Sequence, residues 1–235
     1  MLCWSAPKYC RMWGVYAGRR ATPGMTLVAF DFDGTLAESE MLDRIAARAG
    51  VGDEVAAITE RAMRGELSYA DSLRERAQLV AGLPESAAAA VYDGVRLRDG
   101  AGDLVAKLRD GGVRVVVLTG GFKPGVAAAF DAAGVAADGV VGNRLVAADG
   151  ELTGAVEGPL VEGTKDDALR DACEAAGTTP AAAVAVGDGA NDVPMLDAAG
   201  TAIGVDPKPG VDAHCDHTVS SMDALGRVLD DHGIA

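Results

Sequence analysis

The sequence is poor in aromatic residues and cysteine, and it lacks any long hydrophobic run. Aromatic side chains make up 4% of the 235 residues, and no stretch approaches the roughly 18 consecutive apolar residues of a membrane helix. The four scattered cysteines are too few for a disulfide framework. These absences argue against a membrane protein and a disulfide-rich secreted domain, and they predict a cytoplasmic location.

Positive charge is also scarce. Lys and Arg together number 21 against 35 Asp and Glu, which gives a formal net charge of −14. Residues 1–24 hold four basic residues and no acid, so the remaining 211 residues carry −18. A surface this acidic repels nucleic acid and anionic membranes, so we expect neither as a partner. We expect a small-molecule phosphate ester as the partner and a monomer or homodimer as the assembly.

The apolar content of the chain, at 49%, is enough for a sizeable core. Apolar segments of strand length alternate with helical patterns, which is typical of a parallel sheet covered on both faces. The expected strands cover 28–30, 113–118 and 181–186, with an extended segment from Val140 and a hairpin at 145–156. The expected helices between and after them cover 103–109, 124–133, 165–176 and 192–199.

Residues 39–97 interrupt this alternation, because they carry only helical patterns, at 39–46, 68–80 and 85–91. We therefore predict an α/β fold, a doubly wound (Rossmann-like) parallel sheet core with a small inserted helical cap domain. The core would comprise 25–38 and 98–235, and the cap 39–97. Residues 1–24 are predicted to be a dispensable, disordered extension, since Met25 stands directly before the first strand.

The first strand ends in Asp31-Phe32-Asp33-Gly34-Thr35. Two carboxylates at i and i+2 after a buried strand hold like charges close together, which is costly unless a cation or a proton lies between them. Alone, the motif could equally be an Asp/Gly turn. Later segments decide in favour of a site.

Two further strands end in polar, glycine-rich segments, Thr119-Gly120-Gly121-Phe122 and Gly187–Asp192, and Lys165 begins the helix before the second. In a doubly wound sheet these segments converge on one edge. The combination suits phosphoryl transfer, with Asp31 and Asp188 as oxygen ligands for Mg²⁺. Thr119, the Gly120 N–H and Lys165 would hold the phosphate oxygens. One aspartate would attack phosphorus while a second moves protons.

These motifs resemble the four motifs of the haloacid dehalogenase superfamily. More narrowly, the chain resembles its phosphoserine phosphatases from about Met25 onwards. The segments that narrow the resemblance are Glu40–Asp43, Arg61–Leu67, Ser72–Arg76, Gly120–Phe122 and Gly189–Leu196. The resemblance implies hydrolysis of O-phospho-L-serine by a Mg²⁺-dependent phosphomonoesterase.

The resemblance also implies a role for each matching residue. Asp31 would be the nucleophile that forms an aspartyl-phosphate, and Asp33 the general acid and base. Mg²⁺ would be held by Asp31, Asp188 and the main-chain carbonyl of Asp33, with Asp192 and Asn191 supporting the metal and phosphate side. The phosphate would be bound by Thr119, Gly120 and Lys165.

In the predicted cap, the resemblance implies that Glu40 meets the substrate ammonium, and that Met63 and Tyr69 line the pocket. A phosphoserine site needs one anion and one fork-shaped cation for the amino-acid end of the substrate. Spacing leaves both Arg74 and Arg76 open as that cation, since two residues apart on a helix they point in different directions. The family pattern favours Arg76 for the substrate carboxylate.

Two positions depart from the phosphoserine group, which usually has Ser where this chain has Gly34 and Thr119. These departures bear on the substrate more than on the chemistry. The alternative is therefore a related phosphatase or a phosphotransferase that acts on another small phosphorylated metabolite. A phospho-acceptor signalling module also uses an Asp, a Thr or Ser and a Lys around Mg²⁺, but it needs neither Asp33 nor a helical insertion.

Overall fold

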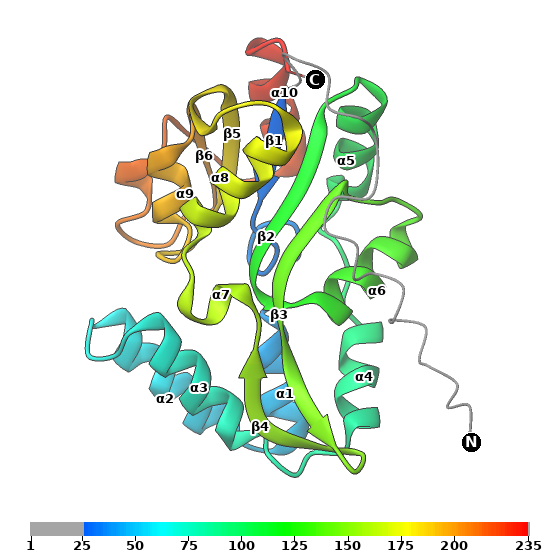
Figure 1. Ribbon diagram of the computed structural model, residues 1–235, viewed down its shortest axis with the longest axis vertical. Coiled ribbons are helices and arrows are strands. Elements are labelled where there is room, and N and C mark those ends of the chain that lie inside the picture. Colours follow the sequence, from blue (N-terminus) through cyan, green and yellow to red (C-terminus); the bar gives the residue numbers. More distant parts are fainter. Residues whose placement is uncertain (1–25, 235) are drawn as a thin grey trace.

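A computed structural model describes residues 26–234, so the prediction for residues 1–24 lies outside the described residues. Its centre is a seven-stranded sheet in the order β4-β3-β2-β1-β5-β6-β7 (Figure 1). The strands are β1 (Leu27–Phe30), β2 (Arg114–Phe122), β3 (Gly139–Ala148), β4 (Glu151–Glu157), β5 (Ala183–Gly187), β6 (Thr201–Val205) and β7 (His217–Val219). Only β4 is antiparallel to its neighbour.

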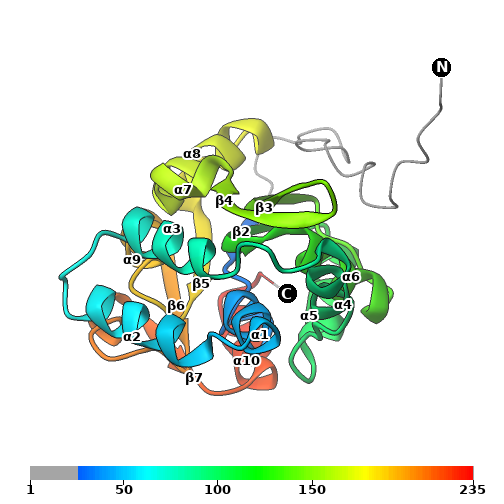
Figure 2. The same ribbon diagram turned by 90° about the horizontal axis from the view of Figure 1, so that it is seen from below.

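Alternating side chains of β1 face two separate cores, because successive residues of a strand point to opposite sides of a sheet. Val28 and Phe30 pack on one side and Leu27 and Ala29 on the other, and all four are fully buried. The first side carries α5 (Ala101–Asp110), α6 (Lys123–Ala133) and α10 (Met222–Asp231). The second carries α8 (Lys165–Ala176) and α9 (Val193–Ala198), as Figure 2 also shows. The predicted doubly wound sheet is confirmed.

Four of the five helices between β1 and β2 form an insertion, and in Figure 1 they lie below the carboxyl ends of the parallel strands. They are α1 (Met41–Ala49), α2 (Gly52–Met63), α3 (Tyr69–Leu79) and α4 (Glu85–Asp93). The sequence pattern delimits α1, α3 and α4 but not α2. α2 buries a single residue, Val55, and its other apolar side chains are partly or fully exposed.

The β3–β4 hairpin is attached to the inserted helices. The backbone of Leu152 exchanges hydrogen bonds of 2.8 Å with Gly82 and Leu83, and α3 packs on β4. The turn of the hairpin is Asp149-Gly150, with φ of 52° and 85°, as the sequence predicted from that dipeptide. The hairpin therefore belongs in space with the inserted helices, although its strand β3 is hydrogen-bonded to β2.

The predicted boundaries of two strands were wrong. β2 continues to Phe122, whereas residues 119–122 were expected to form a turn, and its register with β3 shifts between Leu118 and Phe122. β5 begins at Ala183, because Pro180–Ala182 form a 3₁₀ turn. Two short strands, β6 and β7, and the helix α10 were not predicted. Within residues 26–234, no helix has the length and apolar character needed to span a bilayer.

Candidate active site

The carboxyl ends of β1 and β5, which are neighbours in the sheet, bring Asp31 and Asp188 together. The order of the strands reverses at this point, and such a reversal leaves a crevice in an open α/β sheet. Carboxylate oxygens of Asp31, Asp188 and Asp192 lie within 4.8 Å of one another, and all three side chains are buried. The structure therefore gathers the carboxylates of the first and last motifs, which lie far apart in the sequence.

Lys165 lies inside this carboxylate cluster. Its Nζ donates to Oδ1 of Asp31 and to Oδ1 of Asp192, and the residue is only 3% exposed. Burial by itself disfavours the ammonium, but the two carboxylates outweigh it and raise the pKa of Lys165, which stays charged. Burial raises the pKa of Asp31 well above its usual range, the charge of Asp192 raises it further, and Lys165 opposes both.

Asp192 shapes the loop that carries Asp188. Its Oδ2 accepts hydrogen bonds from the backbone N–H groups of Asp188, at 2.9 Å, and Gly189, at 2.8 Å. A Cβ on Gly187 would lie 2.6 Å from Oδ2 of Asp192, so glycine is needed there for close approach. With Lys165 on its other oxygen, Asp192 is engaged on both sides, which makes it an orienting group for the cluster.

Asp33 lies apart from the cluster and contacts the start of α1. Its Oδ1 accepts a hydrogen bond of 3.0 Å from the backbone N–H of Met41. Burial raises the pKa of Asp33 well above its usual range and the charge of Glu40 adds to the shift, while the Met41 N–H opposes it. A raised pKa favours the protonated carboxyl group, which is the form that a general acid needs.

The structure explains why residue 34 is a glycine. Its φ is +84°, and a Cβ there would lie 2.5 Å from Oδ2 of Asp188. The neighbouring Thr35 donates from Oγ1 to Oδ1 of Asp188 at 3.0 Å. In this chain, the departure from the phosphoserine group at residue 34 therefore follows from how tightly the two loops pack.

The glycine-rich segment at the end of β2 faces the inserted helices. Thr119 is fully buried and its Oγ1 accepts the backbone N–H of Gly121 at 2.9 Å. A Cβ on Gly120 would overlap Oη of Tyr69 and lie 3.6 Å from Nδ2 of Asn191. The structure thus brings Tyr69, Gly120 and Asn191 together. Burial of the hydroxyl raises the pKa of Tyr69 to about 12, so the phenol stays neutral.

Arg74 and Arg76 have different hydrogen-bond partners. Arg74 donates from Nη2 to Glu162 in α7 (Pro159–Glu162), across the edge between the inserted helices and the sheet. Arg76 donates from Nε to the carbonyl of Ser72, at 3.2 Å, and its charge acts on the hydroxyl of Tyr69. Arg74 is thus paired with an exposed carboxylate, and the role of Arg76 toward a substrate carboxylate stays a prediction. Met63 is 69% exposed at the end of α2, so its place in a pocket wall stays a prediction.

Lys208 is a residue that the sequence analysis missed. Its Nζ lies 3.0 Å from Oδ2 of Asp188 and 3.1 Å from Oε1 of Glu40. Burial disfavours its charge, but Glu40 and Asp188 outweigh burial and raise the pKa of Lys208. Lys208 follows β6, a strand that the sequence did not reveal, so no local signal placed it at this edge of the sheet.

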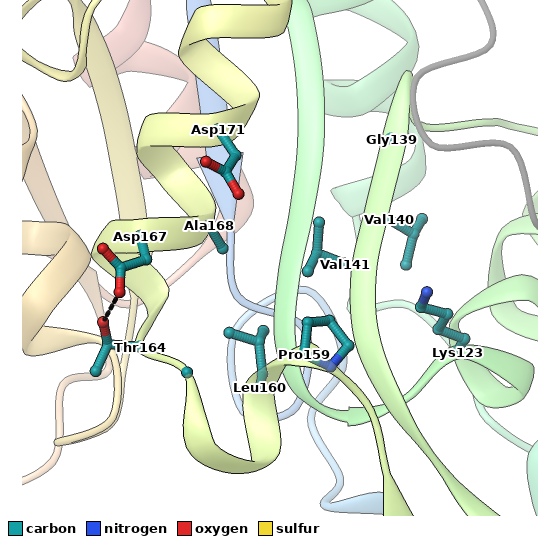
Figure 3. Close-up of a pocket in the computed structure, with 11 residues that line it drawn as sticks. Lys123, Gly139, Val140, Val141, Pro159, Leu160, Thr164, Asp167, Ala168 and Asp171 are labelled. Atoms are coloured by element: carbon teal, nitrogen blue, oxygen red, sulfur yellow. Dashed lines mark hydrogen bonds between the residues drawn. The ribbon is translucent and has the colours of Figure 1, made fainter.

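A groove of about 280 Å³ lies elsewhere, between β3 and α8 (Figure 3). Lys123 lines one side of the groove and Asp167 and Asp171 the other, with Val141 and Leu160 between them. Thr164 donates from Oγ1 to Oδ2 of Asp167 at 3.3 Å. The residues that line this groove include none of the buried carboxylates, so it is distinct from the candidate site.

Comparison with known proteins identifies the class. The family model of the haloacid dehalogenase-like hydrolases matches residues 28–197, which include all four motifs. The chain belongs to this family, and it is therefore an enzyme of the hydrolase class.

Within the family, the similar proteins include several phosphoserine phosphatases. The phosphoserine phosphatase of Streptococcus thermophilus is 39% identical over 88% of this chain and 97% of its own length. The phosphoserine phosphatase SerB2 of Mycobacterium tuberculosis is 43% identical over 83% of this chain, and the phosphoserine phosphatase of Archaeoglobus fulgidus is 37% identical over 85%. The chain spans 47% and 58% of the lengths of those two relatives.

Solved structures agree in fold. A phosphoserine phosphatase solved as a phospho-aspartyl intermediate analogue superposes with a TM-score of 0.80 at 35% identity, covering 88% of this chain and 98% of that chain. A substrate-bound phosphoserine phosphatase gives 0.79 at 34% identity over the same shares. At this identity the likeness extends beyond the fold to the family.

Proposed function

We propose that this protein is a Mg²⁺-dependent phosphomonoesterase that hydrolyses O-phospho-L-serine to serine and phosphate. The observation that carries the proposal is the different environment of two neighbouring aspartates. Asp31 contacts the Lys165 cation, whereas Asp33 contacts a backbone N–H and has Glu40 nearby. The Lys165 cation favours the anionic form of Asp31, the form that must attack phosphorus, whereas the charge of Glu40 favours the protonated form of Asp33.

The residues present fit a hard divalent cation. The side chains of Asp31 and Asp188 offer only carboxylate oxygens, they are buried, and burial raises the pKa of both. Oxygen ligands of this kind suit Mg²⁺, and Asp31, Asp188 and the main-chain carbonyl of Asp33 would hold it. When bound, Mg²⁺ would neutralise charge on the phosphate oxygens and on the carboxylates.

The reaction then proceeds in two displacements. In the first, an oxygen of Asp31 forms a bond to phosphorus while the bond from phosphorus to the serine oxygen breaks, and Asp33 donates its proton to that oxygen. In the second, Asp33 takes a proton from water, the water oxygen bonds to phosphorus, and the bond to Asp31 breaks. Asp33 ends protonated and Asp31 ends as a carboxylate, so the enzyme is restored.

The remaining residues recognise the substrate. Lys165, Thr119 and the Gly120 N–H would bind phosphate oxygens, with Asn191 and Tyr69 beside them. Glu40 would meet the ammonium and Arg76 the carboxylate, and the inserted helices that carry both would serve as a cap, with residues 39–97 as its extent. Support comes from the relatives named phosphoserine phosphatase. The release of serine would suit an enzyme of serine biosynthesis in the cytoplasm.

A panel of phosphate esters tests each part of this recognition. O-Phospho-L-serine carries both charges, phosphoethanolamine lacks the carboxylate, phosphoglycolate lacks the ammonium, and p-nitrophenyl phosphate lacks both. We expect kcat/KM to be highest for phosphoserine. Arg76→Ala should lower it by roughly 10- to 100-fold, the range for a charged hydrogen bond, and should leave phosphoethanolamine unchanged.

Arg74→Ala is the matched control, since Arg74 is on the same helix and pairs with the exposed Glu162. Exposed ion pairs contribute little, so this variant should stay within about threefold of wild type for every ester. If Arg76→Ala slowed phosphoserine and phosphoethanolamine equally, carboxylate recognition by Arg76 would be wrong. Faster turnover of another ester would instead assign the related phosphatase or phosphotransferase activity.

A further inference from the structure

Asn143, in β3, is a buried polar residue that the motifs do not include. It is 1% exposed, and both ends of its amide contact backbone groups that lie beside the site. Nδ2 donates to the carbonyl of Gly120 at 2.9 Å, and Oδ1 accepts the backbone N–H of Leu160 at 3.0 Å. Because one partner is a carbonyl and the other an N–H, the orientation of the amide is fixed by chemistry.

The first contact lies where the ladder between β2 and β3 is interrupted. Leu118 pairs with Val141 and Phe122 with Asn143, so four steps along β2 match two steps along β3. Two extra residues of β2 therefore bulge out of register between these pairs, at Thr119–Gly121. A bulge leaves backbone groups without ladder partners, and the Asn143 amide takes the Gly120 carbonyl in their place.

The second contact lies at the start of α7. Leu160 is in its first turn, where backbone N–H groups have no partner within the helix. Gly158 precedes this helix without a capping side chain, and a Cβ on it would lie 2.6 Å from Cα of Asn143. Asn143 therefore caps α7 from the neighbouring strand. α7 ends at Glu162, three residues before the buried Lys165.

We infer that Asn143 is a positioning residue for phosphate binding. A single buried amide holds the Gly120–Gly121 peptide, which directly follows the Gly120 N–H, and the first turn of α7, which leads to Lys165. The Gly120 N–H and Lys165 are two of the groups proposed to hold phosphate oxygens. Glutamine is longer by one methylene, leucine lacks both polar atoms, and an ionised aspartate cannot donate to the Gly120 carbonyl. Asparagine alone among these residues satisfies both contacts at this distance.

Inhibition by inorganic phosphate tests the inference, with p-nitrophenyl phosphate as substrate, because neither ligand needs the proposed amino-acid pocket. Asn143→Asp keeps the volume and the acceptor but replaces the donor. We expect the Ki of inorganic phosphate to rise by about tenfold or more. We also expect kcat/KM for p-nitrophenyl phosphate and phosphoserine to fall by the same factor, since both carry the same phosphate.

Acidification gives a signature that a merely structural role would not produce. A protonated carboxyl at this position regains a donor for the Gly120 carbonyl. The ratio of the Ki of Asn143→Asp to that of wild type should therefore fall as the pH falls. Asn143→Ser removes the amide without adding charge, and it keeps the test open if the aspartate variant does not fold. Its Ki should rise by a similar factor and keep a constant ratio to wild type across pH.

Asp138→Asn is the matched control, because Asp138 directly precedes β3, the strand that carries Asn143. Asp138 is also buried, accepts the backbone N–H of Val115 at 2.9 Å and pairs with Arg109. Its exchange should lower the melting temperature and leave the Ki of phosphate unchanged. A Ki within twofold of wild type in a folded Asn143 variant would overturn the inference.

The inference rests on the proposed phosphatase function, but the two can fail separately. If the wild-type protein hydrolysed no phosphate ester, the proposed function would be wrong. Calorimetric titration with inorganic phosphate would then still compare Asn143→Ser with wild type. Equal affinity of the two proteins in that titration would overturn the role of Asn143 itself.

Discussion

Oδ1 of Asp33 accepts a 3.0 Å hydrogen bond from the backbone N–H of Met41, the first residue of α1. The proposed general acid therefore lies in the loop after β1 but takes its orientation from the inserted helices. A free N–H at a helix start is a ready partner for a carboxylate, and here it fixes the side chain that must reach the leaving oxygen.

Asp33→Asn should lower kcat for phosphoserine by about 10²- to 10⁴-fold, the usual contribution of a positioned proton donor. The amide oxygen can still accept the Met41 N–H, so the melting temperature should change little. p-Nitrophenolate leaves without a proton, so the first turnover of p-nitrophenyl phosphate should be spared and appear as a burst in stopped flow. An equal loss in the first turnover of both substrates would contradict the role of Asp33.

Asp31→Asn should abolish turnover and stabilise the metal-free protein at neutral pH. Burial, and then Asp192, raise the pKa of Asp31 in the folded state above its ordinary value of 3.8. The unfolded chain then ionises first, so stability is fully present below pH 3.8 and is lost as the pH rises through the raised pKa. An asparagine side chain at this position does not ionise, so the variant does not lose this stability as the pH rises.

The measurement is the melting temperature in a chelator and in Mg²⁺ across pH. In a chelator, the variant should melt higher than wild type at pH 7, with roughly 2–4 °C for each kcal/mol gained. Mg²⁺ should stabilise wild type more than the variant. Retained turnover, or a lower melting temperature of the variant in chelator, would refute the assignment.

Tyr69→Phe should lower kcat/KM for every phosphate ester by roughly 3- to 10-fold, the value of one neutral hydrogen bond. The hydroxyl lies against Gly120 in the proposed phosphate-binding segment. Because its pKa is raised to about 12, Tyr69 stays a donor throughout the working range and should add no alkaline limb below that pH. A limb near pH 10 that disappears in the variant would show that the hydroxyl ionises in solution.

Gly34→Ala should lower turnover by more than tenfold, because a Cβ with φ of +84° would lie 2.5 Å from Oδ2 of Asp188. Gly50→Ala is the matched control, since Gly50 has φ of +77° but nothing within 4 Å of its Cβ position. Both variants should lose about 1–2 kcal/mol of stability from the left-handed conformation. Only Gly34→Ala should raise the Mg²⁺ concentration needed for half-maximal activity. Equal kinetic effects in both variants would show that backbone strain alone is responsible.

Most of the α/β core could be predicted from the sequence, because the patterns that indicate it are local. Continuous apolar strands, glycine-rich strand ends and the Asp149-Gly150 turn can each be recognised within ten residues. The convergence of Asp31 and Asp188 then follows from topology, since parallel strands end at one edge. The helix α2, which buries only Val55, was not delimited from the sequence.

The sequence by itself determined the family, the order of the motifs and the type of chemistry, because each depends on residue types at fixed spacings. Only the tertiary structure showed that Arg74 pairs with Glu162, that Lys208 lies beside Asp188, and which backbone groups Asn143 contacts. Such contacts join segments separated by many residues, and side-chain direction depends on packing that no local pattern records. The parts of the site outside the motifs therefore depend on contacts between distant segments of the chain and not on local sequence propensity.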